Sequence, residues 1–319
     1  MIVRWGLGEL EPLLREVAIE RALLVTSGRF GALEVPVAER FTGVRSHAPV
    51  EVVAAATQAA VGLDGLVGLG GGSAIDTAKA VSAASGLPLV AVPTTYAGSE
   101  WTAYFGMRDE ASGTKTGGSG AHTVAVVYEP ELTLGLPREE SVGTAMNALA
   151  HCAEALYAGP LGNATTGANL IATWLPPVAE TGDDLQARTS LLEGAMRAGM
   201  ALTERGLFLA HAMAQALGGR YGVSHGAMNA ICLAPALRYN AAVVPDAVSM
   251  LAQAMAVDDA PRRIEELARL GGFVRLRDFD IPESELSEVA EATAARPAAR
   301  SNPRPADAGD IDVLLRSVW

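Results

Sequence analysis

The stretch Gly68–Ala80, GLGGGSAIDTAKA, determines how the N-terminal part of this chain is interpreted. It overlaps the apolar run Gly65–Leu69, a predicted strand, and leads directly into a helical pattern over Ala74–Ala84. Glycines in such a strand-to-helix turn let a phosphate approach the backbone, and the first turn of the helix supplies free N–H groups. Ser73 and Asp76 have the spacing of a capping box. We therefore predict a phosphate-binding turn here, although the spacing differs from G-x-G-x-x-G.

Short apolar runs alternate with helical patterns over the rest of the first part of the chain. Further strands are predicted at Ala22–Thr26, Leu87–Val92 and Thr123–Tyr128, and a further helix at Val50–Val61. This alternation is typical of a parallel sheet covered by helices, and the predicted fold of this part is therefore α/β and Rossmann-like.

From Pro137 onward the texture changes to long Ala- and Leu-rich segments at helical period. The predicted helices are Ser141–Ala158, Ala164–Val178, Leu185–Ala201, Phe208–Leu217, Ala227–Tyr239, Ala247–Ala256, Ile264–Leu270 and Glu283–Ala294. The segment Leu134–Ser141 joins the last predicted strand to the first long helix. We therefore predict an α/β domain over residues 1–136 and an all-helical domain over residues 137–319.

The composition favours a compact protein and argues against several classes of partner. The chain has 319 residues, half of them hydrophobic (50%), and a formal net charge of −12. No apolar run is long enough to span a membrane and the N-terminus does not resemble a signal peptide, so a cytoplasmic location is expected. The absence of a basic cluster argues against nucleic-acid binding. Cys152 and Cys232 lack the spacing of a metal site or a disulfide framework, and we interpret both as core residues.

A second cluster of polar residues lies where the next predicted strand ends. In VPTTYAGSEWT, Val92–Thr102, hydroxyl groups are offered by Thr94, Thr95 and Ser99. Ligands of parallel sheets collect at the carboxyl ends of the strands, so these side chains are candidates for ligand contact. A turn that is merely rich in Ser and Thr is an equally good interpretation of this segment taken alone.

The histidines of the helical part form a third signal. Asn147 and His151 are four residues apart on a predicted helix and therefore share a face, whereas His211 and His225 flank a glycine-rich turn. Imidazoles are common ligands of Zn²⁺ and Fe²⁺, and a carboxamide is a poor one because it brings no charge. Spacing alone leaves open whether the three histidines meet at one point.

Taken together, these motifs resemble the iron-containing alcohol dehydrogenase superfamily, and within it the maleylacetate reductases. The resemblance spans nearly the whole chain and also rests on four further stretches: FTGVRSHAPVEV (Phe41–Val52), YEPELTLGLP (Tyr128–Pro137), MNALAHCAEALYA (Met146–Ala158) and the closing NPRPADAGDIDVLLRSVW. It implies a dehydroquinate synthase-like architecture, in which an N-terminal dinucleotide-binding domain precedes a helical catalytic domain.

The resemblance also implies a cofactor and the residues that bind it. NADH or NADPH would lie in the cleft between the domains and exchange hydride with a carbonyl or alcohol carbon. Its pyrophosphate would be held by Gly71, Gly72 and Ser73. The residues expected along the rest of the cofactor are Thr94, Thr95, Ser99, Ser27 and, near the nicotinamide ribose, Lys115. Lys79 and Lys115 are the only lysines of the chain, and both lie in family motifs.

A departure from the family pattern concerns the metal. Metal-dependent members carry an aspartate where this chain has Asn147, and loss of that anion weakens a divalent-metal site. Maleylacetate reductases share the asparagine. We therefore expect zinc or iron to be absent or weakly held; if bound, its ligands would be Asn147, His151, His211 and His225. Without a metal these residues line the substrate pocket, and either His211 or His225 supplies the proton.

A second departure concerns the substrate. Maleylacetate reductases typically have further histidines where this chain has Gln215, Asn229 and Pro235, which argues against a dicarboxylate unless Arg220 or Arg238 compensates. The alternatives are an alcohol dehydrogenase of a biosynthetic pathway, oxidising for example a 3-hydroxy acid that then decarboxylates, a metal-dependent alcohol dehydrogenase, and a non-catalytic dinucleotide-binding protein.

Two smaller expectations concern cofactor choice and assembly. The residues after the strand Ala22–Thr26 read SGRF, so Ser27 and Arg29 leave no carboxylate to repel the 2′-phosphate of NADPH. The superfamily often forms dimers, and a paired edge strand at Met1–Arg4 is a route to a homodimer.

Overall fold

A computed structural model of the chain describes residues 1–110 and 114–319. The chain forms two compact units. The first unit comprises Met1–Thr95 and Ser99–Gly135, and the second comprises Tyr96–Gly98 and Leu136–Trp319.

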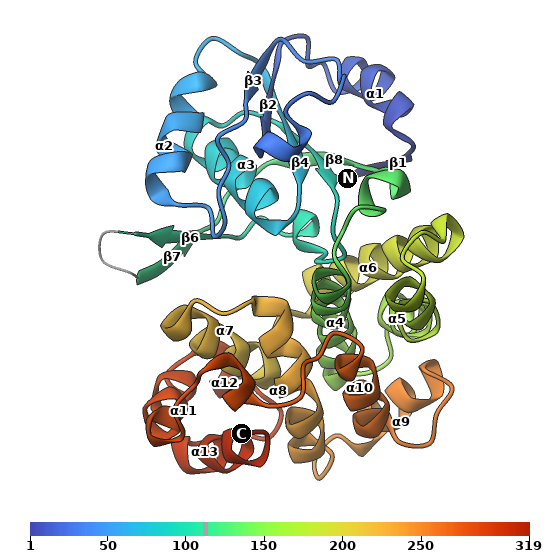
Figure 1. The fold of residues 1–319 in the computed structure, drawn as a ribbon, viewed down its shortest axis with the longest axis vertical. Coiled ribbons are helices and arrows are strands. Elements are labelled where there is room, and N and C mark those ends of the chain that lie inside the picture. The colour runs from blue at the N-terminus through green and yellow to red at the C-terminus, as the bar shows by residue number, and fades with distance from the viewer. Residues whose placement is uncertain (111–113) are drawn as a thin grey trace. The chain divides into compact units, whose positions relative to one another are not determined.

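The first unit is built on a six-stranded sheet in which every neighbouring pair of strands is parallel (Figure 1). The strand order is β1-β8-β5-β4-β2-β3. The bounds are β1 Ile2–Trp5, β2 Ala22–Thr26, β3 Glu39–Phe41, β4 Gly65–Gly70, β5 Leu89–Pro93 and β8 Thr123–Tyr128. The predicted parallel sheet is thus confirmed, and its four predicted strands are observed to within two residues at each end. β3 is short and exposed, and no apolar pattern in the sequence marks it.

Apolar side chains cover both faces of this sheet, as expected of a parallel sheet. Leu23 and Val25 of β2 pack with helices α2 (Val50–Ala59) and α3 (Gly72–Ser85) on one face. Leu24, between them in sequence, points to the opposite face and packs with helix α1 (Leu10–Glu16). Successive residues of a strand point to opposite faces, so a strand covered on both faces is mostly apolar. β2 is apolar from Ala22 to Val25, and all of it is buried.

A two-stranded antiparallel hairpin, β6 Phe105–Asp109 and β7 Thr114–Gly118, was not predicted from the sequence. Its strands read FGMRD and TKTGG, so neither shows a buried-strand alternation. The hairpin pairs with itself rather than joining the main sheet, and its sequence therefore lacks the apolar pattern that marks the sheet strands.

The second unit is helical, as predicted. Its helices are α4 Arg138–Ala155, α5 Gly162–Glu180, α6 Leu185–Arg205, α7 Leu209–Tyr221, α8 His225–Asn240, α9 Pro245–Ala254, α10 Ala260–Arg269, α11 Leu286–Ala294, α12 Pro297–Arg300 and α13 Ala308–Ser317. Helix α4 is central and packs against α5, α6 and α8. It is buried almost throughout from Ser141 onward, which explains its Ala-rich sequence.

The tripeptide Tyr96–Gly98 belongs to the second unit, although it lies within the stretch 1–136 expected to form the first. The Tyr96 hydroxyl accepts a hydrogen bond from the buried Arg188 (3.0 Å), and its N–H donates to Thr144 Oγ1 (3.3 Å). Gly98 has a φ of +73° and lies so close to helix α6 that a Cβ would be 3.2 Å from the Ala195 carbonyl oxygen. These contacts attach the tripeptide to the helices.

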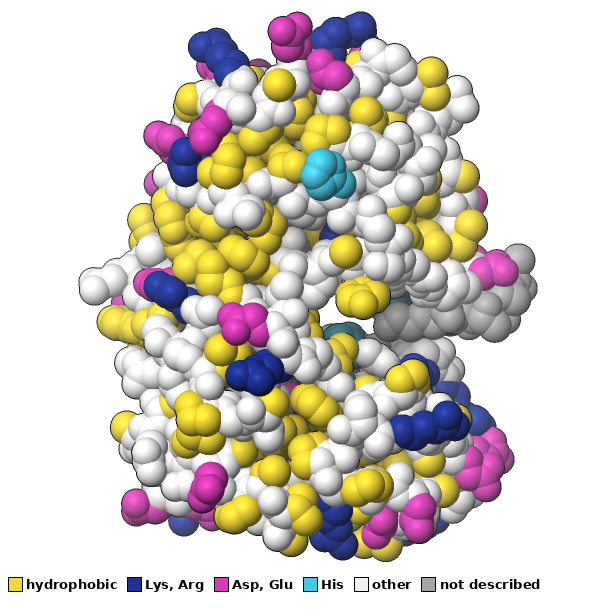
Figure 2. Space-filling view, turned by 180° about the vertical axis from the view of Figure 1, so that it is seen from behind, with side chains coloured by type: hydrophobic (Ala, Val, Ile, Leu, Met, Phe, Trp, Pro, Cys, Tyr) yellow, Lys and Arg dark blue, Asp and Glu magenta, His cyan; other side chains and the backbone are white. Residues whose placement is uncertain are grey.

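Two expectations concern contacts of the protein with a membrane and with a second copy of the chain. Within the described part of the chain, no helix combines the length and the apolar character needed to cross a membrane. On the face shown in Figure 2, acidic and basic side chains are interspersed. Strand β1 lies at the edge of the sheet, and its neighbour in the sheet is β8. The homodimer through this edge stays a prediction.

Candidate active site

The glycine-rich turn joins β4 to α3, and the backbone rather than side chains shapes it. Helix α3 begins at Gly72, with Gly71 as its N-cap and no side-chain cap. The predicted capping box is therefore wrong, because Ser73 already lies inside the first turn. Ser73 Oγ instead accepts a hydrogen bond from the His47 N–H (3.0 Å), and Asp76 Oδ2 accepts one from the Gly106 N–H (3.1 Å).

The residues expected to hold a dinucleotide gather at the carboxyl edge of the sheet. A Cβ on Gly71 would lie 2.9 Å from Thr95 Cγ2, so only glycine fits there. The Thr94 N–H donates to the Gly70 carbonyl oxygen (2.9 Å), which ties the turn to the end of β5. Ser27 directly follows β2, whose last residue is in register with Leu69 of β4. The edge therefore combines a helix N-terminus, hydroxyl groups and a backbone open to close approach, features suited to a pyrophosphate.

Ser99 and Lys115 are two further residues expected to bind the cofactor. Ser99 belongs to the first unit and begins a short 3₁₀ helix, Ser99–Trp101. Lys115 lies in β7, where its backbone is in register with Arg108, but its side chain is outside the part of the structure that is described. Its expected role at the nicotinamide ribose stays a prediction.

Lys79 is fully buried and binds protein groups rather than facing the turn. Its ammonium donates to the Ser99 carbonyl oxygen (2.8 Å) and to Thr102 Oγ1 (3.3 Å), and it lies 3.4 Å from Asp76 Oδ1. Burial lowers the pKa of Lys79, and the nearby Asp76 opposes that shift. Lys79 therefore attaches helix α3 to the segment after β5, which is a structural role at the carboxyl edge of the sheet.

In the second unit, helix α4 carries a polar stripe in an otherwise apolar sequence. Asn147, His151 and Glu154 lie at helical spacing, so they share one face. Their exposed fractions are only 6%, 4% and 0%. Buried polar side chains require partners, and helices α7 and α8 supply most of them.

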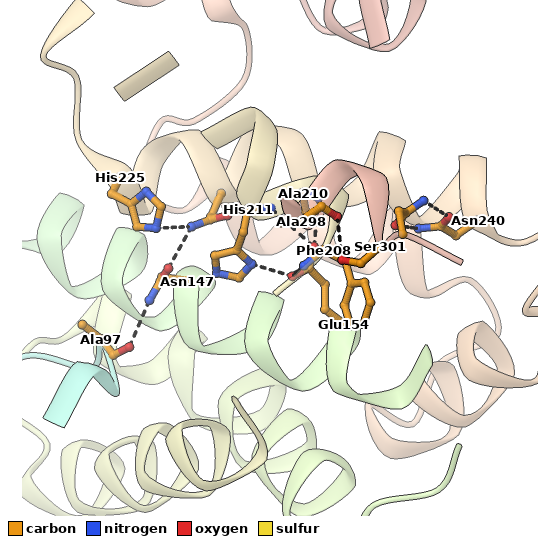
Figure 3. A network of polar contacts seen from close by, with 12 residues as sticks. Ala97, Asn147, Glu154, Phe208, Ala210, His211, His225, Asn240, Ala298 and Ser301 are labelled. Carbon is orange, nitrogen blue, oxygen red and sulfur yellow. Dashed lines mark hydrogen bonds and ion pairs between the residues drawn. The ribbon is translucent and has the colours of Figure 1, made fainter. Parts of the chain in front are cut away.

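Glu154 organises the start of α7 (Figure 3). Its carboxylate accepts hydrogen bonds from the backbone N–H groups of Phe208 (2.8 Å), Ala210 (2.9 Å) and His211 (3.4 Å). It also lies 2.7 Å from His211 Nδ1. An ionised carboxylate is an acceptor only, so this contact assigns a proton to Nδ1 and directs Nε2 to the opposite side of the ring.

A chain of amide groups connects the tripeptide after β5 to His225 (Figure 3). Asn147 donates through Nδ2 to the Ala97 carbonyl oxygen (3.0 Å) and accepts through Oδ1 from Asn229 Nδ2 (2.8 Å). Asn229 Nδ2 is also 3.1 Å from His225 Nε2. Asn229 thus links two of the predicted site residues, Asn147 and His225.

The structure brings all four predicted catalytic residues together. The His211 ring centroid is 4.8 Å from that of His151 and 5.8 Å from that of His225. Two buried ring nitrogens, His151 Nδ1 and His211 Nε2, have no hydrogen-bond partner among the described residues. Burial, and then the neighbouring His211 and His225, hold the pKa of His151 well below its usual range, so this ring is neutral at pH 7. Buried polar atoms without a partner are uncommon in folded proteins, so these two nitrogens are candidates for contact with a ligand.

The donor set does not match a divalent-metal site of the kind found in metal-dependent enzymes. Asn147 brings no charge, and its oxygen already accepts a hydrogen bond from Asn229. Among the described residues, no three His, Cys, Asp or Glu side chains are arranged to hold a metal ion. The carboxylate nearest the cluster, Glu154, is occupied by the N-terminus of α7.

The two arginines considered as partners of an anionic substrate are both neutralised. Arg220 pairs with Glu285 and Glu288 (2.7 and 2.6 Å), and Arg238 pairs with Glu265 (2.5 Å). Both arginines are exposed. The expectation that one of them compensates for the lost histidines is therefore not supported by their contacts.

Comparison with known proteins shows to which family this chain belongs. The profile of iron-containing alcohol dehydrogenases matches residues 3–128, and that of the C-terminal part of the same family matches residues 141–319. The chain belongs to the iron-containing alcohol dehydrogenase family. It is 35% identical to maleylacetate reductase of Burkholderia cepacia and 37% identical to that of Pseudomonas knackmussii, over 99% and 98% of this chain and 95% and 93% of the relatives. This iron-containing alcohol dehydrogenase homologue is thus an oxidoreductase, as predicted, and the non-catalytic alternative is set aside.

Solved structures agree with this membership of the iron-containing alcohol dehydrogenase family. Maleylacetate reductase from Rhizobium superposes with a TM-score of 0.91 at 31% identity, covering 100% of this chain and 95% of that one. Sulfoacetaldehyde reductase from Bifidobacterium kashiwanohense, solved in complex with NAD⁺, shares the fold with a TM-score of 0.89 at 22% identity, covering 100% and 96% of the two chains.

The sequence analysis missed Glu154, the residue that orients His211. The available signal was its position, because it is an acidic residue three positions after His151 in the apolar stretch ALAHCAEALYA. A carboxylate in a helix that is buried on all sides must have a specific partner. Which partner it has depends on α7, which lies far along the chain.

Proposed function

We propose that this oxidoreductase reduces a carbonyl compound with NADH or NADPH and without a catalytic metal. The bound nicotinamide would supply the hydride for the carbonyl carbon. Gly71, Gly72 and Ser73 would hold the pyrophosphate, with Thr94, Thr95 and Ser99 lining the remaining cofactor and Ser27 near the ribose. A proton delivered to the carbonyl oxygen completes the alcohol. We assign that proton to Nε2 of a His211 ring that is protonated on both nitrogens; the Nδ1 proton stays with the Glu154 contact, and the ring is left neutral after the transfer.

The observation that carries this proposal is the state of the His211 ring. Its Nδ1 is held by a buried carboxylate at 2.7 Å, while its Nε2 is buried without a partner among the described residues. A ring fixed on one side and open on the other is suited to general acid–base catalysis. His151 and His225 form the adjoining walls of the site, and Asn147 connects His225 to the backbone at Ala97 through Asn229.

The substrate is a finer question. Maleylacetate is the first candidate because two relatives that align over nearly the whole chain are named maleylacetate reductase. Maleylacetate reductases nevertheless typically have histidines where this chain has Gln215, Asn229 and Pro235. The proposal therefore also covers keto acids other than maleylacetate. Oxidation of a hydroxy acid is the reverse of the same chemistry and uses the same residues.

The function is tested by following oxidation of NADH and NADPH with maleylacetate and a series of keto acids. We expect turnover of at least one keto acid, and full activity after dialysis against EDTA, because the donor set at Asn147 lacks an anion. The control is the same dialysed protein with added Zn²⁺ or Fe²⁺, which should gain nothing. Activity that is lost with the chelator and restored by either ion would show that the metal-independent mechanism is wrong.

The cofactor preference is a separate prediction. No carboxylate follows β2 in Ser27–Phe30, so we expect kcat/KM values for NADPH and NADH that lie within about a hundredfold of each other. The variant Ser27→Asp adds a carboxylate next to the expected ribose position and should lower kcat/KM for NADPH more than for NADH. A wild-type preference for NADH beyond that range would contradict the prediction.

A further inference from the structure

One basic side chain that contacts helix α7 has no acidic partner among the described residues, unlike Arg220 and Arg238. Arg296 immediately precedes helix α12, and its guanidinium Nη1 donates to Gln215 Oε1 (3.3 Å). Gln215 follows His211 by one turn of α7, so the two side chains share a face of that helix. Helix α12 packs against α7.

The hydrogen-bonding state of Arg296 is unusual for a half-buried cation. Its Nε is buried and has no partner, and among the described residues its side chain forms no ion pair and no hydrogen bond apart from that to Gln215. Burial lowers the pKa of Arg296, and no neighbouring carboxylate opposes that effect. An arginine nevertheless stays charged in a protein, so an anion is the missing partner that its environment favours.

The geometry of a guanidinium decides how such an anion binds. Nη1 lies on the same side as Cδ, and Gln215 occupies it. On the opposite edge the protein encloses Nε, whereas Nη2 has no partner among the described residues and is the atom that a carboxylate oxygen can reach. Gln215 therefore holds the group in place without neutralising it, which a histidine or an acidic residue at that position would not do in the same way.

We propose that Arg296 binds a carboxylate of the substrate through Nη2, on the side of α7 that carries His211 and Gln215. This rests on the proposed function, because a keto acid carries the carboxylate and the reducible carbonyl in one molecule. Arg296 thereby takes the place of the cationic histidines that the chain lacks, and it selects keto acids over neutral ketones and aldehydes.

The test compares each keto acid with its methyl ester, which keeps the carbonyl and removes the charge. In Arg296→Gln we expect kcat/KM for the acid to fall about 10- to 100-fold, the range for losing a hydrogen bond to a charged group, while kcat/KM for the ester stays unchanged. The matched control is Arg300→Gln, an exposed arginine at the end of the adjacent helix α12, which should behave as wild type. An unchanged acid-to-ester ratio in Arg296→Gln would overturn the proposal.

A binding measurement separates this proposal from the proposed function. Calorimetric titration with succinate, a dicarboxylate without a reducible carbonyl, reports the anion site without turnover. Binding by the wild type that is lost in Arg296→Gln and kept in Arg300→Gln supports the carboxylate site even if no keto acid is reduced, in which case only the proposed function fails. Equal binding by wild type and Arg296→Gln, or none by the wild type, overturns the assignment of Arg296.

Discussion

The variant His211→Asn is expected to lose about 10²- to 10⁴-fold in kcat, the range typical of removing a general acid. His211 Nε2 is buried, unpartnered and directed by the contact of Nδ1 with Glu154, whereas asparagine can neither carry the proton nor fill the ring's place. The measurement is the steady-state rate with the best keto acid, together with the cofactor Kd, which should not change.

Two further variants make this result specific. His122→Asn replaces an exposed histidine of the first unit and should keep the wild-type kcat. His225→Asn tests the alternative proton donor left open by the sequence. If His225→Asn loses the larger part of kcat and His211→Asn retains it, the proton comes from His225 and the assignment to His211 is wrong.

Truncation of Glu154 should destabilise the protein strongly. Glu154→Ala leaves the buried N–H groups of Phe208 and Ala210 and the Nδ1 of His211 without their acceptor. Removing one partner from such a buried, charged network costs about 3–5 kcal/mol in the free energy of unfolding. The measurement is denaturant unfolding. Glu193→Ala is the control, because its ion pair with Arg197 is partly exposed and should contribute at most about 1 kcal/mol.

Glu154→Gln separates the positioning of His211 from stability. The amide retains one acceptor oxygen, so the free energy of unfolding should fall less than in Glu154→Ala. Its NH₂ group, however, can donate to Nδ1 and favour the wrong tautomer of the ring. We expect kcat to fall about 10- to 100-fold, as for other residues that orient a functional histidine, with a smaller effect on KM and partial recovery in Glu154→Asp. A Gln variant with wild-type kcat would leave Glu154 with a structural role only.

Local periodicity predicted much of the fold. The four apolar runs recognised as strands are strands, because a parallel strand covered on both faces is apolar along most of its length. Helices α4 to α11 of the second unit were also recognised, although several extend beyond the predicted ends; α4, for example, begins at Arg138 rather than Ser141. The short helix α12 (Pro297–Arg300) was not among the predicted helices. The hairpin β6–β7 and the capping box at Ser73 were missed or wrong, since neither depends on a pattern that one short segment carries.

The site was only partly predictable for a related reason. The shared face of Asn147 and His151 follows from helix geometry alone, and the resemblance to a known family named His211 and His225 beside them. The roles of Glu154, Asn229 and Arg296 required their partners, which lie up to 82 residues away along the chain in the case of Asn229 and Asn147. No local pattern indicates which of several arginines lacks an acidic neighbour.

The sequence by itself determined the parallel α/β sheet, the glycine turn at Gly71, the helical second half and membership of an oxidoreductase family, because each depends on residue spacing or on extended similarity. Only the tertiary structure decided that Tyr96–Gly98 packs with the helices, that Lys79 is a buried structural residue, and that Glu154 holds His211 while Arg220 and Arg238 are neutralised. These outcomes depend on distances between segments that are remote in sequence, and packing of the folded chain sets those distances.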